Sequence, residues 1–140
     1  MNISLVGPPL ESPVDEGEYR RVFREMAQER VDGLIVSDYA TNFVYRQLIV
    51  DLAEEARLPT VYPFGEYFEL GGLIAYGASV ADTYTRAAGY IDKILKGANA
   101  AEMPIYLEEK FQLLINLRKA KALGLTIPTS LLVRADEVIE

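Results

Sequence analysis

The chain has 140 residues, of which 50% are hydrophobic and 25% are charged, as in an ordinary globular protein. Its 14 basic and 21 acidic residues give a formal net charge of −7, which disfavours binding to a nucleic-acid backbone. It contains no histidine and no cysteine. The composition therefore excludes a Ser-His-Asp triad, a cysteine nucleophile, a structural zinc site and a disulfide.

The first part of the chain predicts a strand, a helix and a second strand. Residues 3–6 (Ile-Ser-Leu-Val) form a short apolar run that is ended by Gly7 and two prolines. Apolar residues then recur at helical spacing over residues 16–30, with charged residues on the opposite face. The continuous apolar run at residues 34–36 is typical of a strand that is buried on both faces.

The alternation of strands and helices continues through the middle of the chain. Asn42 is a candidate N-cap for a helix that ends near residue 57. Residues 60–62 and 73–76 are predicted strands, separated by one helical turn over residues 66–70. Ser79 and Asp82 then resemble a capping box, which begins a helix over residues 79–95.

The last part of the chain is less regular. Residues 98–109 carry no clear period, and residues 111–115 are a strand candidate. Asn116 is then predicted to cap a short helix that Gly124 ends. We expect a final helical turn or two from Ser130 towards the end of the chain.

This order of elements predicts a single α/β domain over residues 1–140. Strand–helix–strand order with short connections is typical of a parallel sheet with helices on both faces. In open sheets of this kind, ligands bind outside the carboxyl ends of the strands. The rule predicts a binding site at three loops, residues 37–39, 63–66 and 77–79.

Two acidic residues lie in or beside these loops, and each has two interpretations. Asp38 is suited to contact a ligand, for example by accepting from an ammonium group, or to cap a turn of its own loop. Glu66, with Glu69 one turn on, could bind or protonate a ligand, or lie at a solvated helix end. Neither nucleotide-binding glycine motif occurs, so nucleotide binding is not expected. No other cofactor and no bound metal are expected either.

Aromatic residues also gather at the predicted strand ends. The chain has nine tyrosines and no tryptophan. Tyr39 and Phe64 suit a small-molecule pocket or an interface, because an aromatic ring there can stack on a partner. Tyr62 and Tyr76 also fit a pocket, but as members of alternating strands they are expected in the core slightly ahead of it.

Two long segments resemble a known family. They are residues 58–77 (LPTVYPFGEYFELGGLIAYG) and residues 110–128 (KFQLLINLRKAKALGLTIP), and SLLVRADEVI follows over residues 130–139. The segments resemble ABC-transporter substrate-binding proteins of the type I periplasmic class, in the branch of tryptophan- and tyrosine-type binders. The resemblance extends from about residue 3 to the end of the chain.

The resemblance implies one lobe of a two-lobed receptor that catalyses no reaction. Such a receptor binds a small amino-acid-like solute in the periplasm and delivers it to an ABC permease. Family positions that face the cleft correspond to Ser37, Asp38, Tyr62, Phe64, Gly65, Glu66, Tyr76 and Gly77. Gly65 stands where family members often have arginine. Taken as a complete gene product, the chain shows no signal peptide at its N-terminus, which predicts a cytoplasmic protein.

The resemblance also implies a missing partner. Family members are longer and have a whole first lobe, so residues 1–140 correspond to a truncated second lobe. Within it, residues 79–140 correspond to a helix that crosses the hinge, followed by the tail. The apolar face of this helix (Val80, Tyr84, Ile91 and Leu95) would lack its usual cover, which predicts a homodimer. The alternative function is therefore a ligand-free, oligomerising α/β protein with a structural or interaction role.

Overall fold

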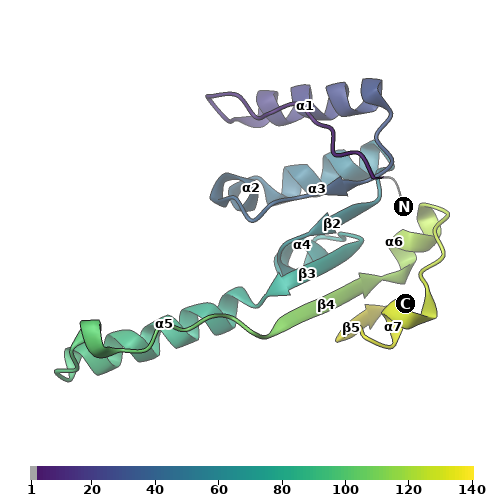
Figure 1. The fold of residues 1–140 in the computed structure, drawn as a ribbon. Helices are drawn as coiled ribbons and strands as arrows, with labels where there is room; N and C mark the ends of the chain where they lie inside the picture. Colours follow the sequence, from purple (N-terminus) through teal and green to yellow (C-terminus); the bar gives the residue numbers. More distant parts are fainter. Residues whose placement is uncertain (1–2) are drawn as a thin grey trace.

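The computed structural model describes residues 3–140, which form a five-stranded sheet flanked by helices (Figure 1). The elements in chain order are α1 (Glu16–Glu29), β1 (Leu34–Ile35), α2 (Ala40–Val44), α3 (Arg46–Glu55), β2 (Thr60–Tyr62), α4 (Gly65–Glu69), β3 (Ile74–Ala78), α5 (Val80–Leu95), η1 (Ala100–Glu102), β4 (Phe111–Asn116), α6 (Leu117–Ala122), α7 (Thr129–Leu132) and β5 (Glu137–Ile139). Among these residues, no helix has the length and hydrophobicity that crossing a membrane requires.

The sheet has the strand order β1-β2-β3-β4-β5. Strands β1, β2 and β3 are parallel, β4 is antiparallel to β3, and β5 is parallel to β4. The expected α/β sheet is therefore present, but it is mixed and not wholly parallel. The reason lies in the excursion made by α5: the chain leaves the sheet at Ala78 and returns at Phe111, its partner in the ladder. Because β4 begins beside the end of β3, it runs back along β3 in the opposite direction.

The main core lies between one face of the sheet and helices α1, α3 and α4. Tyr62 of β2 stacks on Tyr67 of α4, with ring centroids 5.0 Å apart. The buried cluster comprises Tyr19, Val22, Phe23, Met26, Val36, Ile49, Val50, Leu52, Ala53, Tyr62 and Tyr67. A smaller cluster of Phe68, Ala75 and Leu114 continues the core towards β4. These helices hold the β1–β3 part of the sheet in place.

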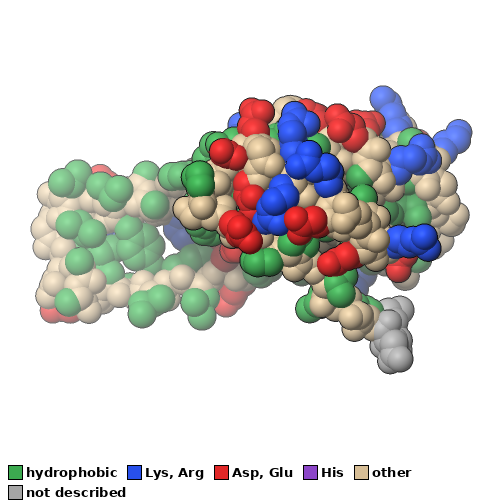
Figure 2. All heavy atoms as spheres, turned by 90° about the horizontal axis from the view of Figure 1, so that it is seen from above, with side chains coloured by type: hydrophobic (Ala, Val, Ile, Leu, Met, Phe, Trp, Pro, Cys, Tyr) green, Lys and Arg blue, Asp and Glu red, His purple; other side chains and the backbone are tan. Residues whose placement is uncertain are grey.

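Helix α1 forms as its sequence period predicts. The Asp15 side chain caps it by accepting a hydrogen bond from the Glu18 amide, at 3.0 Å. Its apolar residues face the core, and its outer face carries an ion-paired row in which Arg21 binds Glu18 at 2.5 Å and Glu25 at 2.7 Å. Figure 2 shows acidic and basic side chains interspersed over the face seen from above, the side on which α1 lies.

Several predicted elements near the N-terminus differ from the structure. Residues 3–6 are exposed and form no strand, because no strand of the described chain lies beside them to complete a ladder. In the run at residues 34–36, Leu34 and Ile35 form β1, but the Ile35 side chain is 74% exposed, so the strand is not buried on both faces. Both errors have one cause, since an apolar run shows strand propensity and not which neighbours will pair with it.

The predicted helix over residues 42–57 is two helices, α2 and α3, separated at Tyr45. Asn42 does not cap either of them but lies buried within α2. At the C-terminus, the helical turn begins at Thr129, and the residues that follow form β5 where further helix was expected. This short strand exists because β4 offers it a free edge to pair with.

Helix α5 projects from the sheet, and none of its residues is buried (Figure 1). Ser79 caps it as predicted, accepting from the Asp82 amide at 3.2 Å. We call residues 98–110 the return segment, because they bring the chain back along α5. The Tyr90 hydroxyl donates to the Pro104 carbonyl at 2.8 Å, and the Arg86 guanidinium lies 3.5 Å from the Tyr106 ring centroid. The two contacts bind the return segment to the helix.

Candidate ligand-binding site

A hollow of about 370 Å³ lies at the carboxyl ends of β1, β2 and β3. Its lining consists of Ile35, Val36, Asp38, Val61, Tyr62, Pro63, Phe64, Tyr76, Gly77, Ala78 and Phe111. This volume falls within the range of small-molecule sites, about 300–1,000 Å³. The hollow is therefore the place in the described chain that fits the strand-end rule.

An aromatic stack forms one wall of the hollow. Tyr76 of β3 and Phe111 of β4 lie with ring centroids 5.7 Å apart and an interplanar angle of 26°. The ladder explains the contact: Ala78 pairs with Phe111 and Tyr76 with Leu113, so the two rings are diagonal neighbours on one face. Both side chains are about half exposed. Sequence reasoning identified Tyr76 but missed Phe111, because no local signal reveals a partner across the excursion of α5.

Asp38 supplies the charge of the site. It follows β1 directly, and it is the one charged side chain among the described residues that line the hollow. Its carboxylate is exposed, and none of the hydrogen bonds found over residues 3–140 involves its side chain. The carboxylate therefore keeps its capacity to accept from a ligand, which is the first of its two interpretations.

The loop after β2 is held close to β3 by a glycine. A Cβ placed on Gly77 would lie 1.8 Å from the Pro63 carbonyl oxygen, so no larger residue fits there without a shift. Phe64 follows Pro63 in this loop and is part of the lining of the hollow, while its ring packs edge-on against Phe43 at the main core, with ring centroids 5.7 Å apart. Gly77 thus shapes the site through its backbone. It lies within β3, which continues to Ala78 and so includes two residues of the loop predicted over residues 77–79.

Tyr62 serves the core more than the hollow. Its side chain is 2% exposed and stacks on Tyr67, as the second of its two interpretations expects. Burial raises the pKa of the Tyr62 hydroxyl to about 12, because the charged phenolate would lose its hydration there. A phenol held neutral in this way does not act as a base near neutral pH.

Four predicted site residues lie outside the lining of the hollow: Ser37, Tyr39, Gly65, which begins α4, and Glu66. Ser37 instead lines a second hollow of about 240 Å³ beside α1, and its Oγ accepts from the Asn42 amide nitrogen at 3.1 Å. Tyr39 is exposed at the start of α2. Glu66 lies in the first turn of α4, where a carboxylate complements the helix dipole. The structure therefore brings Asp38, Tyr62, Phe64, Tyr76 and Gly77 together in the lining and leaves the other four outside it.

Asn42 holds the loop after β1 in place through hydrogen bonds, a role that its sequence position did not reveal. It is buried, and its Oδ1 accepts from the Tyr19 hydroxyl at 2.7 Å. Its amide nitrogen donates to the Ser37 carbonyl at 3.2 Å as well as to Oγ. One side chain thus ties the loop that carries Asp38 to helix α1.

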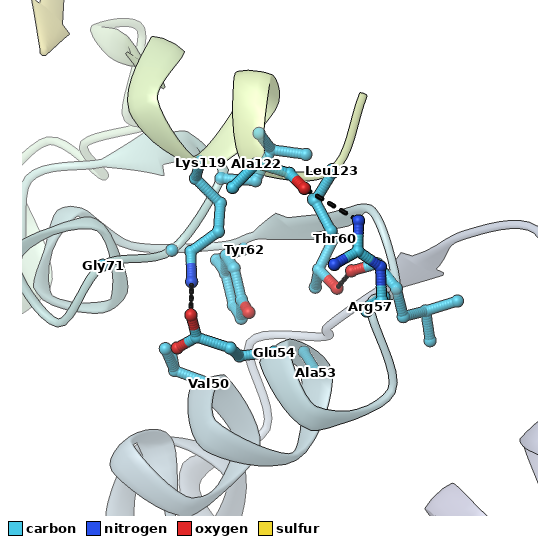
Figure 3. A pocket seen from close by; sticks show the side chains of 13 residues that line it. Val50, Ala53, Glu54, Arg57, Thr60, Tyr62, Gly71, Lys119, Ala122 and Leu123 are labelled. Atoms are coloured by element: carbon cyan, nitrogen blue, oxygen red, sulfur yellow. Dashed lines mark hydrogen bonds and ion pairs between the residues drawn. The ribbon is translucent and has the colours of Figure 1, made fainter. Parts of the chain in front are cut away.

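A tighter cavity of about 80 Å³ lies at the opposite, amino ends of β2 and β3 (Figure 3). It is enclosed between α3 and α6, where Lys119 binds Glu54 at 2.8 Å. Arg57 donates to the Ala122 carbonyl, also at 2.8 Å. Figure 3 shows both contacts bridging the two helices, so the charged groups here already have partners. The cavity is therefore a gap in the packing between α3 and α6, and its charged groups stabilise the contact between these helices.

Within residues 3–140, no cluster of three or more acidic, His or Cys side chains could hold a metal.

The sequence matches the family described as ABC transporter substrate binding protein over residues 15–139. No curated protein sequence matches the chain at a significant level. Among solved structures, a conserved domain protein from Vibrio cholerae O1 biovar El Tor has a TM-score of 0.79 at 23% identity, covering 88% of this chain and 41% of its own.

Two further structures are similar. A protein from Streptococcus pneumoniae, described as an ABC domain in complex with L-Trp, has a TM-score of 0.79 at 27% identity, covering 89% of this chain and 43% of its own. A ligand-free, open substrate-binding protein with adhesive properties from Clostridium difficile has a TM-score of 0.58 at 19% identity, covering 89% and 41%. The chain thus spans about two fifths of each of these structures and has the α/β fold of one lobe. From the match over residues 15–139, the chain belongs to the ABC transporter substrate binding protein family.

Proposed function

We propose that this chain is the solute-binding component of an ABC transporter and binds an amino-acid-like solute without catalysis. The observation that carries the proposal is the hollow at the strand ends, whose lining combines the Asp38 carboxylate with aromatic side chains. The L-Trp bound to the pneumococcal protein supports an aromatic amino acid as the solute. Delivery of the solute to an ABC permease, on the periplasmic side of a membrane, is part of the same proposal.

The chemistry of the hollow suits one end of an amino acid. The Asp38 carboxylate can accept hydrogen bonds from the solute's ammonium group, and such charge-assisted bonds are stronger than neutral ones. Phe64 and Tyr76 supply apolar contact for the side chain. No Lys or Arg is among the described lining residues, so this lobe offers the solute's carboxylate no cation.

The test is a titration of the ¹⁵N-labelled chain with L-tryptophan, L-tyrosine and L-leucine, followed by NMR. We expect shifts in the loops that carry Asp38 and Phe64, and a loss of affinity of about tenfold or more in Asp38→Asn. Glu66→Gln is the matched control, since Glu66 lies outside the lining and its removal should leave the affinity unchanged. Absence of binding by every solute would contradict the proposal and favour the ligand-free alternative.

A second candidate function, self-association, rests on the bare apolar face of α5. Tyr84 and Leu95 are 74% and 82% exposed, although both are large and apolar. Together with Val80, Ala87, Ile91 and Ile94, they form a stripe at the spacing by which helices pack on one another. An exposed apolar stripe of this kind is typical of a surface that another protein surface covers.

The total surface also indicates that a face of the chain is left uncovered. The accessible surface is 9802 Å². A monomer of this size is expected to expose about 7,250 Å², which leaves an excess of about 2,500 Å². A standard interface buries about 800 Å² on each partner. We therefore propose a homodimer in which α5 is covered, an arrangement compatible with solute binding at the strand ends.

Sedimentation of the purified chain tests the dimer. Ile91→Asp places a charge in the stripe and should yield monomers, because the charge would lose its hydration in the interface. Thr85→Asp adds the same charge to the same helix but on another face, so it should leave the dimer intact. A monomeric wild-type chain at tens of micromolar would overturn this proposal.

A further inference from the structure

We propose that the open edge of β1 binds an extended, uncharged apolar strand of a partner polypeptide. The inference goes beyond the proposed solute binding and does not depend on it. It is carried by two features that meet at one place: a row of backbone groups without a neighbouring strand, and an apolar hollow whose described lining contains no charged residue.

Strand β1 lies at one end of the sheet, with β2 on one side only. The Leu34 amide donates to the Pro59 carbonyl at 2.8 Å, towards β2. The Val36 amide likewise donates to the Val61 carbonyl at 3.0 Å. Because alternate residues of a strand direct their backbone groups to opposite edges, the N–H and C=O of Ile35 point away from β2.

This outer edge has no partner in the part of the chain that the structure describes. No strand there pairs with it, and none of the loop and turn hydrogen bonds over residues 3–140 involves the Ile35 backbone. The Ile35 side chain is also exposed. An open sheet edge of this kind is a template for the addition of a further strand.

A hollow of about 240 Å³ lies against the same edge. It is bounded by residues of the N-terminal segment, of α1 and of β1, and no residue of β2 is among its described lining, so it lies on the outer side of β1. Val22, Phe23 and Met26 are the residues with which α1 lines it. A quarter of the chain is charged, yet none of the described lining residues is. The hollow therefore suits an apolar, uncharged occupant.

The combination favours a strand over a small apolar molecule. A strand beside β1 would lie about 4.8 Å from it and would supply hydrogen-bond partners for the N–H and C=O of Ile35. A small hydrocarbon would leave both groups unpaired. Every second side chain of the strand would meet the apolar wall formed by α1, where a charged group would lose its hydration.

The N-terminal segment offers the same occupant a second contact. Val6 lines the hollow and ends the run at residues 3–6, which has the composition of a strand but is exposed and forms no ladder. Two sets of unpaired backbone thus border one hollow. This arrangement supports a strand as the occupant, because a strand can pair along both of its edges.

The probe is a short capped peptide of threonines alternating with valines and isoleucines, with a lysine at each end for solubility. The control peptide has the same side chains but carries N-methyl groups on two consecutive central residues, which removes one backbone donor from each edge. Amide hydrogen exchange of the ¹⁵N-labelled chain, followed by NMR, reports the contact. We expect the first peptide at saturation to slow exchange of the Ile35 amide about tenfold or more. The Leu34 and Val36 amides, already bonded to β2, should change little.

A pair of variants tests the same contact from the side of the chain. Ile35→Pro removes the outward N–H but leaves both bonds to β2 possible, since proline is tolerated on edge strands. We expect it to weaken binding of the fluorescently labelled peptide about tenfold or more, as measured by anisotropy. Ile35→Ala keeps the N–H and loses most of the side chain, so it should weaken binding less. Circular dichroism confirms that each variant folds, and the N-methylated peptide tests the proposal on the wild-type chain.

Three results would overturn the inference and leave solute binding at the strand ends untouched. The first is absence of peptide binding. The second is equal binding of the two peptides, which would mean apolar contact without strand pairing. The third is an Ile35 amide that is already protected in the free chain, because residues 3–6 or a second copy would then occupy the edge.

Discussion

The carbonyl oxygen of Pro63 lies in the space beside Gly77 where any other residue would place its Cβ. A Cβ built on Gly77 would be 1.8 Å from this oxygen. Strand β3 and the loop after β2 are thereby in contact through their backbones, and this contact positions the loop that carries Phe64. The shape of the hollow depends on the absence of a side chain at one residue.

Gly77→Ala should therefore destabilise the fold and disturb the hollow. The added methyl group must displace the loop or the strand, and overpacking of this kind costs about 1–3 kcal/mol. Urea unfolding followed by circular dichroism measures the change. The matched control is Gly89→Ala in exposed α5, where nothing lies within 4 Å of the new Cβ. That variant should be stabilised by up to about 1 kcal/mol, and equal stability of Gly77→Ala and the wild type would contradict the argument.

The hydrogen bond between Tyr19 and Asn42 should contribute measurably to stability. Tyr19→Phe leaves the buried Asn42 Oδ1 without its donor, so we expect a loss of about 1–3 kcal/mol in the free energy of unfolding. Asn42→Ala should cost at least as much, because it also frees the loop at Ser37. A double-mutant cycle measures the coupling between the two residues. A coupling energy near zero would show that the two side chains act independently.

Removal of the Tyr67 hydroxyl should stabilise the protein. Tyr67 is fully buried, and its hydroxyl has no hydrogen-bond partner among the described residues. Tyr67→Phe keeps the stack on Tyr62 and removes a polar group that gains nothing from burial. We expect the free energy of unfolding to rise by about 1 kcal/mol, as measured by urea unfolding. A fall would instead reveal a partner for the hydroxyl, such as a buried water.

Buried tyrosines should make the fold sensitive to alkali. Burial raises the pKa of Tyr19 and of Tyr62 to about 12, from an ordinary value of 10.0. The unfolded chain then releases these protons near pH 10, whereas the folded chain holds them to about pH 12. The free energy of unfolding therefore keeps its full value, as far as these two tyrosines are concerned, below pH 10, and it falls as the pH rises from 10 to 12.

Urea midpoints at about pH 9, 10 and 11 test this dependence. The decline should be shallower in Tyr62→Phe, which has no proton to release at this position, than in the wild type. A midpoint independent of pH over this range would mean that burial does not shift these groups.

The local features of the chain could be predicted from its sequence because they depend on near neighbours. Helix α1 formed where apolar residues recur at helical spacing, and Ser79 and Asn116 cap the helices they were expected to cap. The strand-end loops were also predictable, since a buried apolar run and the polar residue that follows it are adjacent in the chain. Asp38 and Phe64 were placed just after strands in this way, where the structure has them after β1 and β2.

Features that depend on pairing between distant segments were not predictable. Residues 3–6 have the composition of a strand, but no neighbouring strand completes a ladder with them. Residues 137–139 were expected to be helical, yet they pair with β4. Phe111 reaches the hollow because the chain turns back after α5, and no period or motif near residue 111 indicates that return.

By itself, the sequence determined the α/β class, the order of most helices and strands, the absence of His and Cys chemistry, and the residues at the strand ends. The tertiary structure alone decided which of those residues share a hollow, which ring stacks on Tyr76, and that Ser37 and Glu66 lie outside the lining of that hollow. The physical reason is that propensity and capping act over a few residues. Pairing between strands and packing between helices depend instead on which distant surfaces meet.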